Sequence, residues 1–456
     1  MKLNKTTLLL CAVLGTTTSN LALAAQKAPH NKQKQKQTSS VKNLKQELQQ
    51  LKQSYRNKIA ELEMRLSDIE DSNDDTQENV EQLAIDVSQQ GNQKAANTFN
   101  PGVWMILNGR FVNYSDDFTY QLPGFFLGNE AGPGEQGLQL SESELNMSAN
   151  VDDKFYAWST ISFGAEGAAV EEAYLQTLNI GNGFNIKFGE FFSDIGYLAS
   201  KHTHTDDFAN RPLPYEAFLG GQYGDAGIQT TWLAPTDLYW ESGVELYRGD
   251  NFPAAGASNS GIGVWTAFTH IGGDIGVSQS WRAGLSYLHA DVTDRQSPAG
   301  DSFTGVSKLT IADFIYKWAP QGNRVDQEIK LQGEYFFRNE QGFFSAANDG
   351  NLTNEPLSRD QNGWYIEGVY RFARQWRVGL RTSRLHADNL PVQFNNSFLD
   401  ERDHTPTQHS LMLDWTNSEF SRIRLQVDSN NLDGNHNNVW ILQYLASFGA
   451  HGAHSF

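Results

Sequence analysis

Cysteine is nearly absent from this 456-residue chain, and the single one, Cys11, lies close to the N-terminus. Two lysines precede a short apolar run over residues 8–14, and Ala22-Leu23-Ala24 offers small residues for cleavage, so residues 1–24 are predicted to be a secretory signal peptide. A lipidation site at Cys11 is the alternative, but Leu10 is bulky where such sites need a small residue. Once the signal is removed, no cysteine is left for a disulfide framework or a thiolate site.

Long apolar runs and a positive charge balance are also missing. Outside the signal no stretch of 18 apolar residues occurs, which excludes a helical membrane protein. The net charge of −18 argues against a nucleic-acid partner, which needs a basic face. We find no Gly-x-Ser-x-Gly, His-Glu-x-x-His or phosphate-loop motif and predict no enzyme. A mean hydropathy of −0.52 fits a soluble protein, and equally a barrel in which one face of each strand meets lipid.

The segment after the signal has two parts with different patterns. Residues 25–40 are rich in lysine and glutamine without an apolar period, which predicts a flexible tether. Residues 41–90 carry an apolar seam at spacings of three and four, which is typical of a coiled coil. The seam consists of Val41, Leu44, Leu48, Leu51, Tyr55, Ile59, Leu62, Leu66, Ile69, Val80, Leu83 and Val87. Because one isolated helix cannot bury this seam, we expect self-association; an amphipathic helix on another surface is the alternative.

From about residue 100 the hydrophobic period changes to two, the period of β-strands. Sixteen strands are expected, at residues 103–114, 138–151, 155–164, 169–180, 184–192, 226–233, 238–248, 260–270, 280–290, 306–318, 325–338, 361–372, 375–386, 408–416, 420–428 and 438–449. Short turns alternate with long connections, and an aromatic-rich last strand precedes the terminal Phe456, both typical of bacterial outer-membrane barrels. The predicted fold is all-β: a sixteen-stranded antiparallel transmembrane β-barrel at residues 100–456, preceded by an α-helical coiled coil.

Charged residues alternate with apolar ones along several expected strands, as in Arg422-Ile423-Arg424-Leu425. A basic side chain on the lipid face near the bilayer midplane costs about 2–4 kcal/mol, so these charges should line the lumen. The expected inward residues are Lys187, Lys330, Arg371, Arg377, Arg381, Arg422 and Arg424, with Glu142, Glu144, Glu171, Glu241, Glu245, Glu328, Glu334 and Glu367. Opposed charges across a lumen create a field that filters solutes; mutual neutralisation that stiffens the barrel is the alternative interpretation.

The longest connection, residues 193–225, lies between the fifth and sixth expected strands. It contains Lys201, His202, His204, Asp206 and Asp207. Two imidazoles and two carboxylates suit Zn²⁺ or a similar ion, so His202, His204, Asp206 and Asp207 are candidate metal ligands. A solvated polar loop without a ligand is the alternative. We expect no resident cofactor, and zinc would be a bound or transported ion.

Two stretches, residues 187–196 (KFGEFFSDIG) and 213–227 (LPYEAFLGGQYGDAG), resemble the fifth strand and constriction loop of substrate-specific porins. These include the phosphate-selective and siderophore porins, and the chain also resembles barrels labelled zinc-regulated outer-membrane receptors. The whole layout resembles a plug-less porin with an N-terminal periplasmic coiled coil. The resemblance implies that the loop with residues 201–207 folds into the lumen as a constriction. Phosphate-selective porins use a ladder of lumen Arg and Lys, whereas this mixed lumen favours a cationic or metal-complexed solute.

The resemblance implies an outer-membrane channel of a Gram-negative cell through which small hydrophilic solutes diffuse passively. Expected partners are membrane lipid, two further copies in a homotrimer, the barrel-assembly machinery, and peptidoglycan reached by the coiled coil in the periplasm. An uptake receptor for zinc or a metal–siderophore complex is the alternative function. A structural envelope tether that uses the coiled coil is a third.

Overall fold

The computed structural model describes Lys52 and residues 101–449, except residues 116–119, 129–130, 165–166, 179, 256–260, 348–351 and 396. The chain divides into two compact units, residues 1–98 and residues 99–456. The expected signal peptide, tether and coiled coil lie outside the described residues apart from Lys52, which is helical. Everything that follows concerns the second unit.

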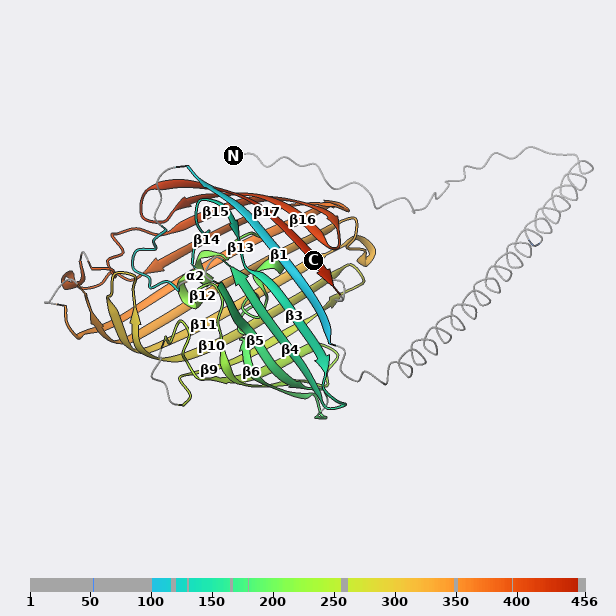
Figure 1. Ribbon diagram of the computed structural model, residues 1–456, viewed down its shortest axis with the longest axis horizontal. Coiled ribbons are helices and arrows are strands. Elements are labelled where there is room, and N and C mark those ends of the chain that lie inside the picture. Colours follow the sequence, from blue (N-terminus) through green and yellow to red (C-terminus); the bar gives the residue numbers. More distant parts are fainter. Residues whose placement is uncertain are drawn as a thin grey trace, which may run out of the picture. The chain divides into compact units, whose positions relative to one another are not determined.

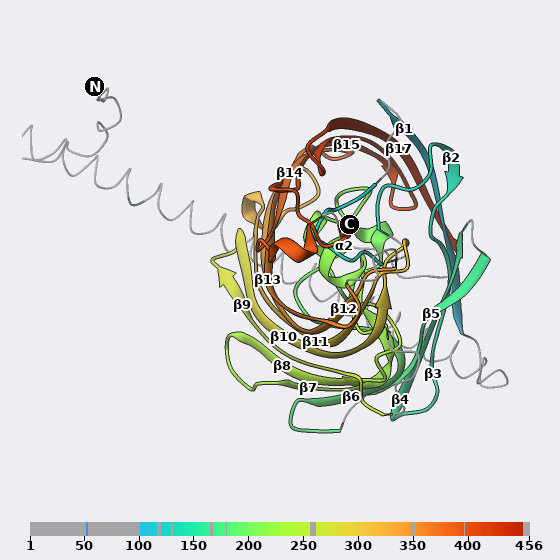
Figure 2. The same ribbon diagram turned by 90° about the vertical axis from the view of Figure 1, so that its left-hand side faces the viewer.

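The second unit is a single closed sheet in which all neighbouring strands are antiparallel (Figures 1 and 2). The strands are β1 (Gly102–Tyr114), β2 (Gly137–Leu140), β3 (Ser143–Asn150), β4 (Phe155–Gly164), β5 (Gly167–Thr177), β6 (Phe184–Phe192), β7 (Gly224–Leu233), β8 (Tyr239–Tyr247), β9 (Val264–Ile275), β10 (Gln279–Gln296), β11 (Ser302–Trp318), β12 (Glu328–Ser345), β13 (Glu355–Ala373), β14 (Trp376–Ala387), β15 (Thr407–Ser418), β16 (Ser421–Asn431) and β17 (His436–Gly449). Pairing of β1 with β17 closes the barrel. Because β2 and β3 both pair with β1, they form one interrupted strand. The described part is therefore the sixteen-stranded barrel that the sequence predicts.

The interruption between β2 and β3 changes which residues face inward. Ser143 Oγ accepts a hydrogen bond from the backbone N–H of Asn108 in β1 at 3.0 Å, and the N–H of Ser141 donates to the Asn108 carbonyl at 2.8 Å. These contacts hold the broken strand against β1. On the two sides of the break, Leu138 is exposed and Glu144 is buried. The break therefore leaves a short segment around Glu142 at the lumen wall.

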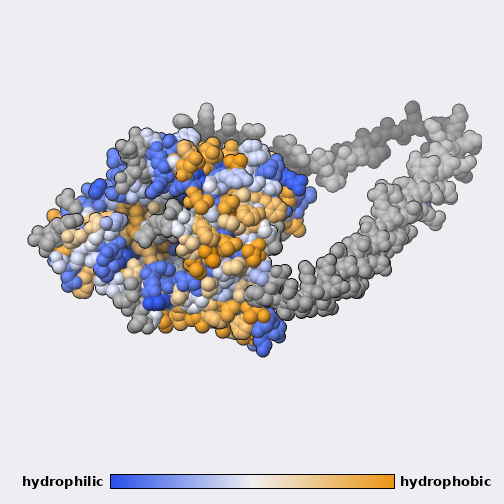
Figure 3. Space-filling view, viewed as in Figure 1, coloured by the Kyte–Doolittle hydropathy of each residue, from blue (hydrophilic) through white to orange (hydrophobic). Residues whose placement is uncertain are grey.

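The two faces of each strand alternate as the sequence predicts. In β16, Arg422, Arg424 and Gln426 are buried, whereas Ile423 and Leu425 between them are exposed. Figure 3 shows hydrophobic side chains gathered over the strands of the viewed face and hydrophilic ones toward the ends. Such an apolar belt around a polar interior is the surface of a barrel that sits in lipid. Among the described residues, no helix is long and apolar enough to cross a membrane.

Loop L3 (residues 193–223) fills much of the interior. It contains the short 3₁₀ segment η1 (Thr203–Thr205) and the helix α2 (Leu213–Leu219). Pro212 and Pro214 stand at the start of α2, where a missing N–H is harmless, and Gly220 ends it in the left-handed conformation with φ 67°. Every residue of α2 is buried. Figure 2 shows the helix inside the ring of strands.

The apolar core lies inside the barrel, beside L3. Phe218 of α2 stacks on Phe336 of β12 with ring centroids 5.9 Å apart. The described part of the first long loop adds Phe125, whose ring meets Phe218 edge-on at 5.8 Å. Two further 3₁₀ segments, η2 (Pro320–Gly322) and η3 (Val392–Phe394), lie in connections between strands, and Phe394 of η3 is buried. The barrel interior is thus a packed core around L3 as well as a polar lumen.

Candidate functional site in the barrel lumen

The two aspartates of L3 are bound to basic side chains. Asp207 accepts hydrogen bonds from Lys330 Nζ at 2.8 Å and from Arg377 Nη1 at 2.7 Å. Burial alone would raise the pKa of the Asp207 carboxyl, but the charges of Lys330 and Arg377 hold it well below its usual range. Asp206 forms an ion pair with Arg211 of the same loop, 2.8 Å from its Nε atom. Both carboxylates are therefore neutralised by cations and do not join the histidines, contrary to the metal-ligand set expected from the sequence.

Three arginines of the wall hold the backbone of L3. Arg422 donates to the carbonyl of His204 at 2.7 Å and Arg424 to the carbonyl of Asp206 at 2.8 Å. Arg381 donates to the carbonyl of Asn210, also at 2.7 Å. Charge-assisted hydrogen bonds of this kind are stronger than neutral ones and fix the position of the groups they join. In the structure all three arginines are buried and anchor the loop through its backbone.

Glu334 of β12 provides a second anchor. Both of its carboxylate oxygens accept from the hydroxyl of Tyr215 in α2 at 3.0 Å, and one accepts from Tyr365 of β13 at 2.5 Å. The same carboxylate accepts the backbone N–H of Tyr197 at 3.1 Å. The side chain of Glu334 is therefore buried against the loop.

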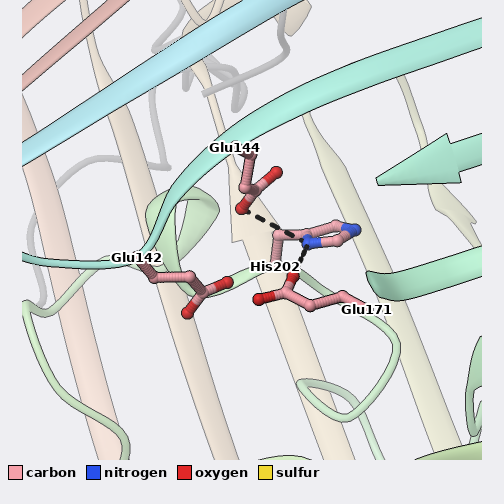
Figure 4. A group of neighbouring side chains, drawn as sticks. All are labelled: Glu142, Glu144, Glu171 and His202. Atoms are coloured by element: carbon pink, nitrogen blue, oxygen red, sulfur yellow. Dashed lines mark ion pairs between the residues drawn. The ribbon is translucent and has the colours of Figure 1, made fainter. Parts of the chain in front are cut away.

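The histidines of L3 face the wall formed by β3 and β5, where glutamates gather; Figure 4 shows His202 with three of these glutamates. His202 Nε2 lies 2.9 Å from Glu172 Oε2, and His202 Nδ1 lies 3.3 Å from Glu144 Oε1 and 3.4 Å from Glu171 Oε2. His204 Nδ1 lies 2.7 Å from the same Glu144 oxygen. Burial alone would lower the pKa of His202, but the charge of Glu144 raises it well above its ordinary value.

Glu142 completes this cluster. One of its oxygens accepts the hydroxyl of Thr203 at 2.8 Å, and the other is buried without a hydrogen bond. Donor atoms of Glu142, Glu144, Glu171 and His202 all lie within 4.8 Å of one another. We call these four residues the lumen cluster.

The remaining lumen charges from the sequence have local partners. Lys187 lies 3.9 Å from Asp194 and over the ring of Tyr174. Lys201 lies over the ring of Tyr197, with Nζ 3.2 Å from the centroid, and burial lowers its pKa well below the usual value. Arg371 donates to the carbonyl of Arg374 at 3.0 Å, and Glu328 lies 3.7 Å from Arg324. These charges are spread around the wall and do not gather at one point.

Two cavities lie along L3, and their linings differ in charge. One, of about 460 Å³, lies between L3 and the wall of β1–β5. Its charged lining residues are Arg110, Glu142, Glu171, Arg211 and Glu216. The other, of about 290 Å³, lies toward the short-turn ends of β11–β14. Its charged lining residues are Lys201, Asp207, Lys317, Arg324, Glu328, Lys330, Arg371 and Arg377. The first lining is mixed with a small acidic excess, and the second is predominantly basic.

The sequence predicted that the glutamates face inward but not that they contact His202. The ladder between β4 and β5 pairs Thr160 with Glu172 and Ile161 with Val170, which leaves Glu171 as an extra bulged residue. The bulge brings Glu171 and Glu172 to the same side, although strict alternation allows only one of two neighbours to face inward. The adjacent pair of glutamates in a strand without any other charged residue was the available signal.

Comparisons with known proteins give one relative and a set of barrels. A protein of Aquifex aeolicus (strain VF5), described only as an uncharacterized protein, is 30% identical over 389 residues, which cover 78% of this chain and 80% of the relative. OprB of Pseudomonas putida superposes with a TM-score of 0.52 and 10% identity, over 80% of this chain and 97% of that one. The outer membrane channel DcaP of Acinetobacter baumannii gives a TM-score of 0.48 and 14% identity, over 76% and 96% of the two chains. No protein-family model matches the sequence.

Proposed function

The chain belongs to the same family as the Aquifex aeolicus protein, and from its closed barrel with a polar loop inside we propose that it is an outer-membrane channel. Small hydrophilic solutes pass through it by passive diffusion, and L3 forms the constriction that selects among them. The fold shared with OprB of Pseudomonas putida agrees with this proposal, as does the apolar outer face of the strands. A sixteen-stranded barrel encloses a lumen wide enough for water, unlike an eight-stranded one.

The observation that carries the proposal is the position of L3. The loop leaves the wall after β6, enters the barrel and is tied on its far side by Lys330, Arg377 and Arg381. Fixed in this way, it lies between the two polar cavities. A rigid polar constriction sieves solutes by size and charge without an energy source.

The charges along L3 point to the solute class. A solute that enters from the long-loop end first meets the cavity lined by Glu142, Glu171 and Glu216. The predominantly basic cavity follows at the short-turn end. Acidic groups at the first cavity raise the local concentration of cations, so we infer a preference for cationic or metal-complexed solutes over anions. Short turns of such barrels face the periplasm. The 460 Å³ cavity, with its small acidic excess, lies at the other end and therefore opens to the outside.

Assembly and placement remain part of the proposal. We infer a homotrimer in the lipid of an outer membrane, inserted by the barrel-assembly machinery, with residues 41–90 as a periplasmic coiled coil that reaches toward peptidoglycan. The mass of the detergent-solubilised complex, measured with and without residues 41–90, tests both the trimer and the contribution of the coiled coil. A monomeric mass for the full chain would refute the trimer.

The channel is tested by conductance and by placed cysteines. We expect the purified full-length protein to give stepwise currents that are linear in voltage in planar bilayers. The described part of the chain contains no cysteine, so one introduced thiol can be modified selectively. Ser162→Cys places a thiol in the wall of the 460 Å³ cavity, and a cationic methanethiosulfonate added there should reduce the current. Leu331→Cys lies on the outer face and is 49% exposed; it is the matched control and should be unaffected.

A barrel that stays closed would refute the channel and favour the second candidate, an uptake receptor for zinc or a metal–siderophore complex. The observation in favour of that candidate is the meeting of His202 with three glutamates in the lumen cluster. Equal inhibition of Ser162→Cys and Leu331→Cys would refute passage of ions through the lumen beside L3.

A further inference from the structure

We propose that the lumen cluster of Glu142, Glu144, Glu171 and His202 binds one divalent transition-metal cation, for which Zn²⁺ is the probe. The inference goes beyond the proposed channel, because equilibrium binding of a metal does not require the barrel to conduct. The four side chains come from three parts of the chain: the break before β3 and β3 itself, the bulge of β5, and L3. Figure 4 shows them converging on one point.

His202 is oriented as metal-binding histidines usually are. One ring nitrogen, Nε2, lies 2.9 Å from Glu172 Oε2, and Glu172 Oε1 in turn accepts the backbone N–H of Phe192 at 3.2 Å. A carboxylate that accepts from one ring nitrogen fixes the tautomer and directs the lone pair of the other nitrogen toward the metal. The other nitrogen, Nδ1, is buried, points at the glutamates and forms no hydrogen bond.

Glu144 and Glu142 are also held in place. Glu144 Oε2 accepts from the side-chain amide of Asn146 at 3.2 Å, and Asn146 Oδ1 accepts the hydroxyl of Thr160 at 2.7 Å. Thr203 holds one oxygen of Glu142. The other oxygen of Glu142 and one oxygen of Glu171 are buried without hydrogen bonds. Buried polar atoms in native proteins are nearly always satisfied, so these unsatisfied oxygens point to a missing ligand.

The charge at this place calls for a cation. Together with Glu172, four carboxylates surround His202 and His204. In the described part of the chain, no lysine or arginine forms an ion pair with these four glutamates. Arg110 and Arg211 line the same cavity; the charge of Arg110 acts on Glu142 from beyond ion-pair distance, and Arg211 is engaged by Asp206. Even with one of the four carboxyls protonated, two imidazoles balance at most two of the three remaining negative charges, and buried charges without a partner are costly.

Donor types and distances fit zinc or a neighbouring transition metal. One imidazole with three carboxylates suits Zn²⁺, Mn²⁺ or Fe²⁺, whereas Ca²⁺ and Mg²⁺ prefer oxygen alone. Bonds of about 2.0–2.2 Å in a tetrahedral site place donors about 3.4 Å apart. The present spacing of up to 4.8 Å therefore needs a movement of about 1 Å. Glu142 and Glu171 also line the 460 Å³ cavity, which gives an ion a route to the site.

The test is zinc binding by the full-length, untagged protein in detergent, measured by isothermal titration calorimetry. The proposal expects one Zn²⁺ per chain. Glu144→Gln and His202→Ala should each weaken binding by at least about 100-fold because they remove a ligand. Glu172→Gln should weaken it by about 10–100-fold because it only positions the ring. Heat-modified electrophoretic mobility confirms that each variant retains its folded barrel.

Controls remove histidines outside the cluster. His386→Ala takes away a half-exposed histidine beside Asp388, and the double variant His451→Ala/His454→Ala removes the two near the C-terminus. Both should bind zinc like the parent. X-ray absorption at the zinc edge of the loaded parent should show oxygen and nitrogen donors with imidazole scattering from a single ring. Absence of stoichiometric binding by the parent, or equal losses in the control variants, would overturn the site while leaving the conductance test unaffected.

Discussion

Two halves of one short stretch, residues 201–207, meet opposite surroundings inside the barrel. His202 and His204 face β3 and β5, where carboxylates outnumber the imidazoles. Asp206 and Asp207, only two residues further on, are paired with Arg211, Lys330 and Arg377. The aspartate half is paired with cations and borders the predominantly basic 290 Å³ cavity, whereas the histidine half faces an excess of carboxylates beside the 460 Å³ cavity.

The difference indicates that one half of this stretch attaches L3 to the wall and the other half can contact a solute. Ion pairs of Asp207 with Lys330 and Arg377 of the wall hold the loop in one position, because loss of either member of a buried pair is costly. Beside the histidine half, Glu142 and Glu171 each have a buried oxygen without a hydrogen bond, and these oxygens can respond to a passing cation. One loop can therefore be rigid at one end and chemically available at the other, which is what a selective constriction needs.

Of the changes considered, removal of the Asp207 carboxylate should have the largest effect, which is on the stability of the docked L3 loop. Asp207→Ala leaves Lys330 and Arg377 without their shared partner, and loss of one member of a buried ion pair costs about 3–5 kcal/mol. We expect amide hydrogens of residues 201–211 to lose protection, as measured by hydrogen exchange with mass spectrometry. Asp388→Asn, whose carboxylate is 57% exposed, is the control and should leave protection unchanged. Parent-like protection in Asp207→Ala would mean that the aspartate half does not hold L3.

Much of this arrangement is predictable from alternation alone. A period of two located all sixteen strands and the inward direction of Arg377, Arg381 and Glu334, since lipid excludes charge from the other face. The length of the connection after the fifth strand and its resemblance to porins indicated the loop that enters the lumen.

The wall residues that each side chain of L3 contacts could not be predicted from alternation. His202 and Asp206 are close in sequence, which made them candidates for one site, but the nearest carboxylates to His202 are 30 residues away at Glu172 and further away at Glu144. The path of L3 decides which wall each residue meets, and no periodic pattern encodes that path. The bulge at Glu171 also breaks the alternation from which inward positions were derived.

The second-largest effect is expected from acid, which should weaken the ion pairs of Asp207 with Lys330 and Arg377. The pKa of Asp207 is well below its usual range because Lys330 and Arg377 outweigh the opposite effect of burial. The docked state therefore gains stability above the ordinary pKa of about 3.9, and this gain is lost as the pH falls below that value. At pH 3 the expected loss is about 1.3 kcal/mol, or about ninefold more open loop.

Hydrogen exchange between pH 6 and pH 3, corrected for the intrinsic rates, measures this change. Asp207→Asn carries no titrating carboxyl at this position and should show a smaller dependence on pH than the parent. An identical pH dependence in the two proteins would assign the acid response to other groups, among them the neighbouring Asp206, whose pKa is raised by burial.

The smallest effect is expected on ion selectivity, when one charge is removed from either of the two cavities. Glu171→Gln removes a negative charge from the 460 Å³ cavity, and Lys317→Gln removes a positive one from the 290 Å³ cavity. With a chelator present to keep the lumen cluster free of metal, the first change should lower the ratio of cation to anion permeability and the second should raise it. About twofold in each direction, or about 0.4 kcal/mol, is expected for one charge at a hydrated wall. Reversal potentials in a salt gradient measure the ratio, and shifts of the same sign in both variants would show that a single charge filter, not two of opposite sign, controls the lumen.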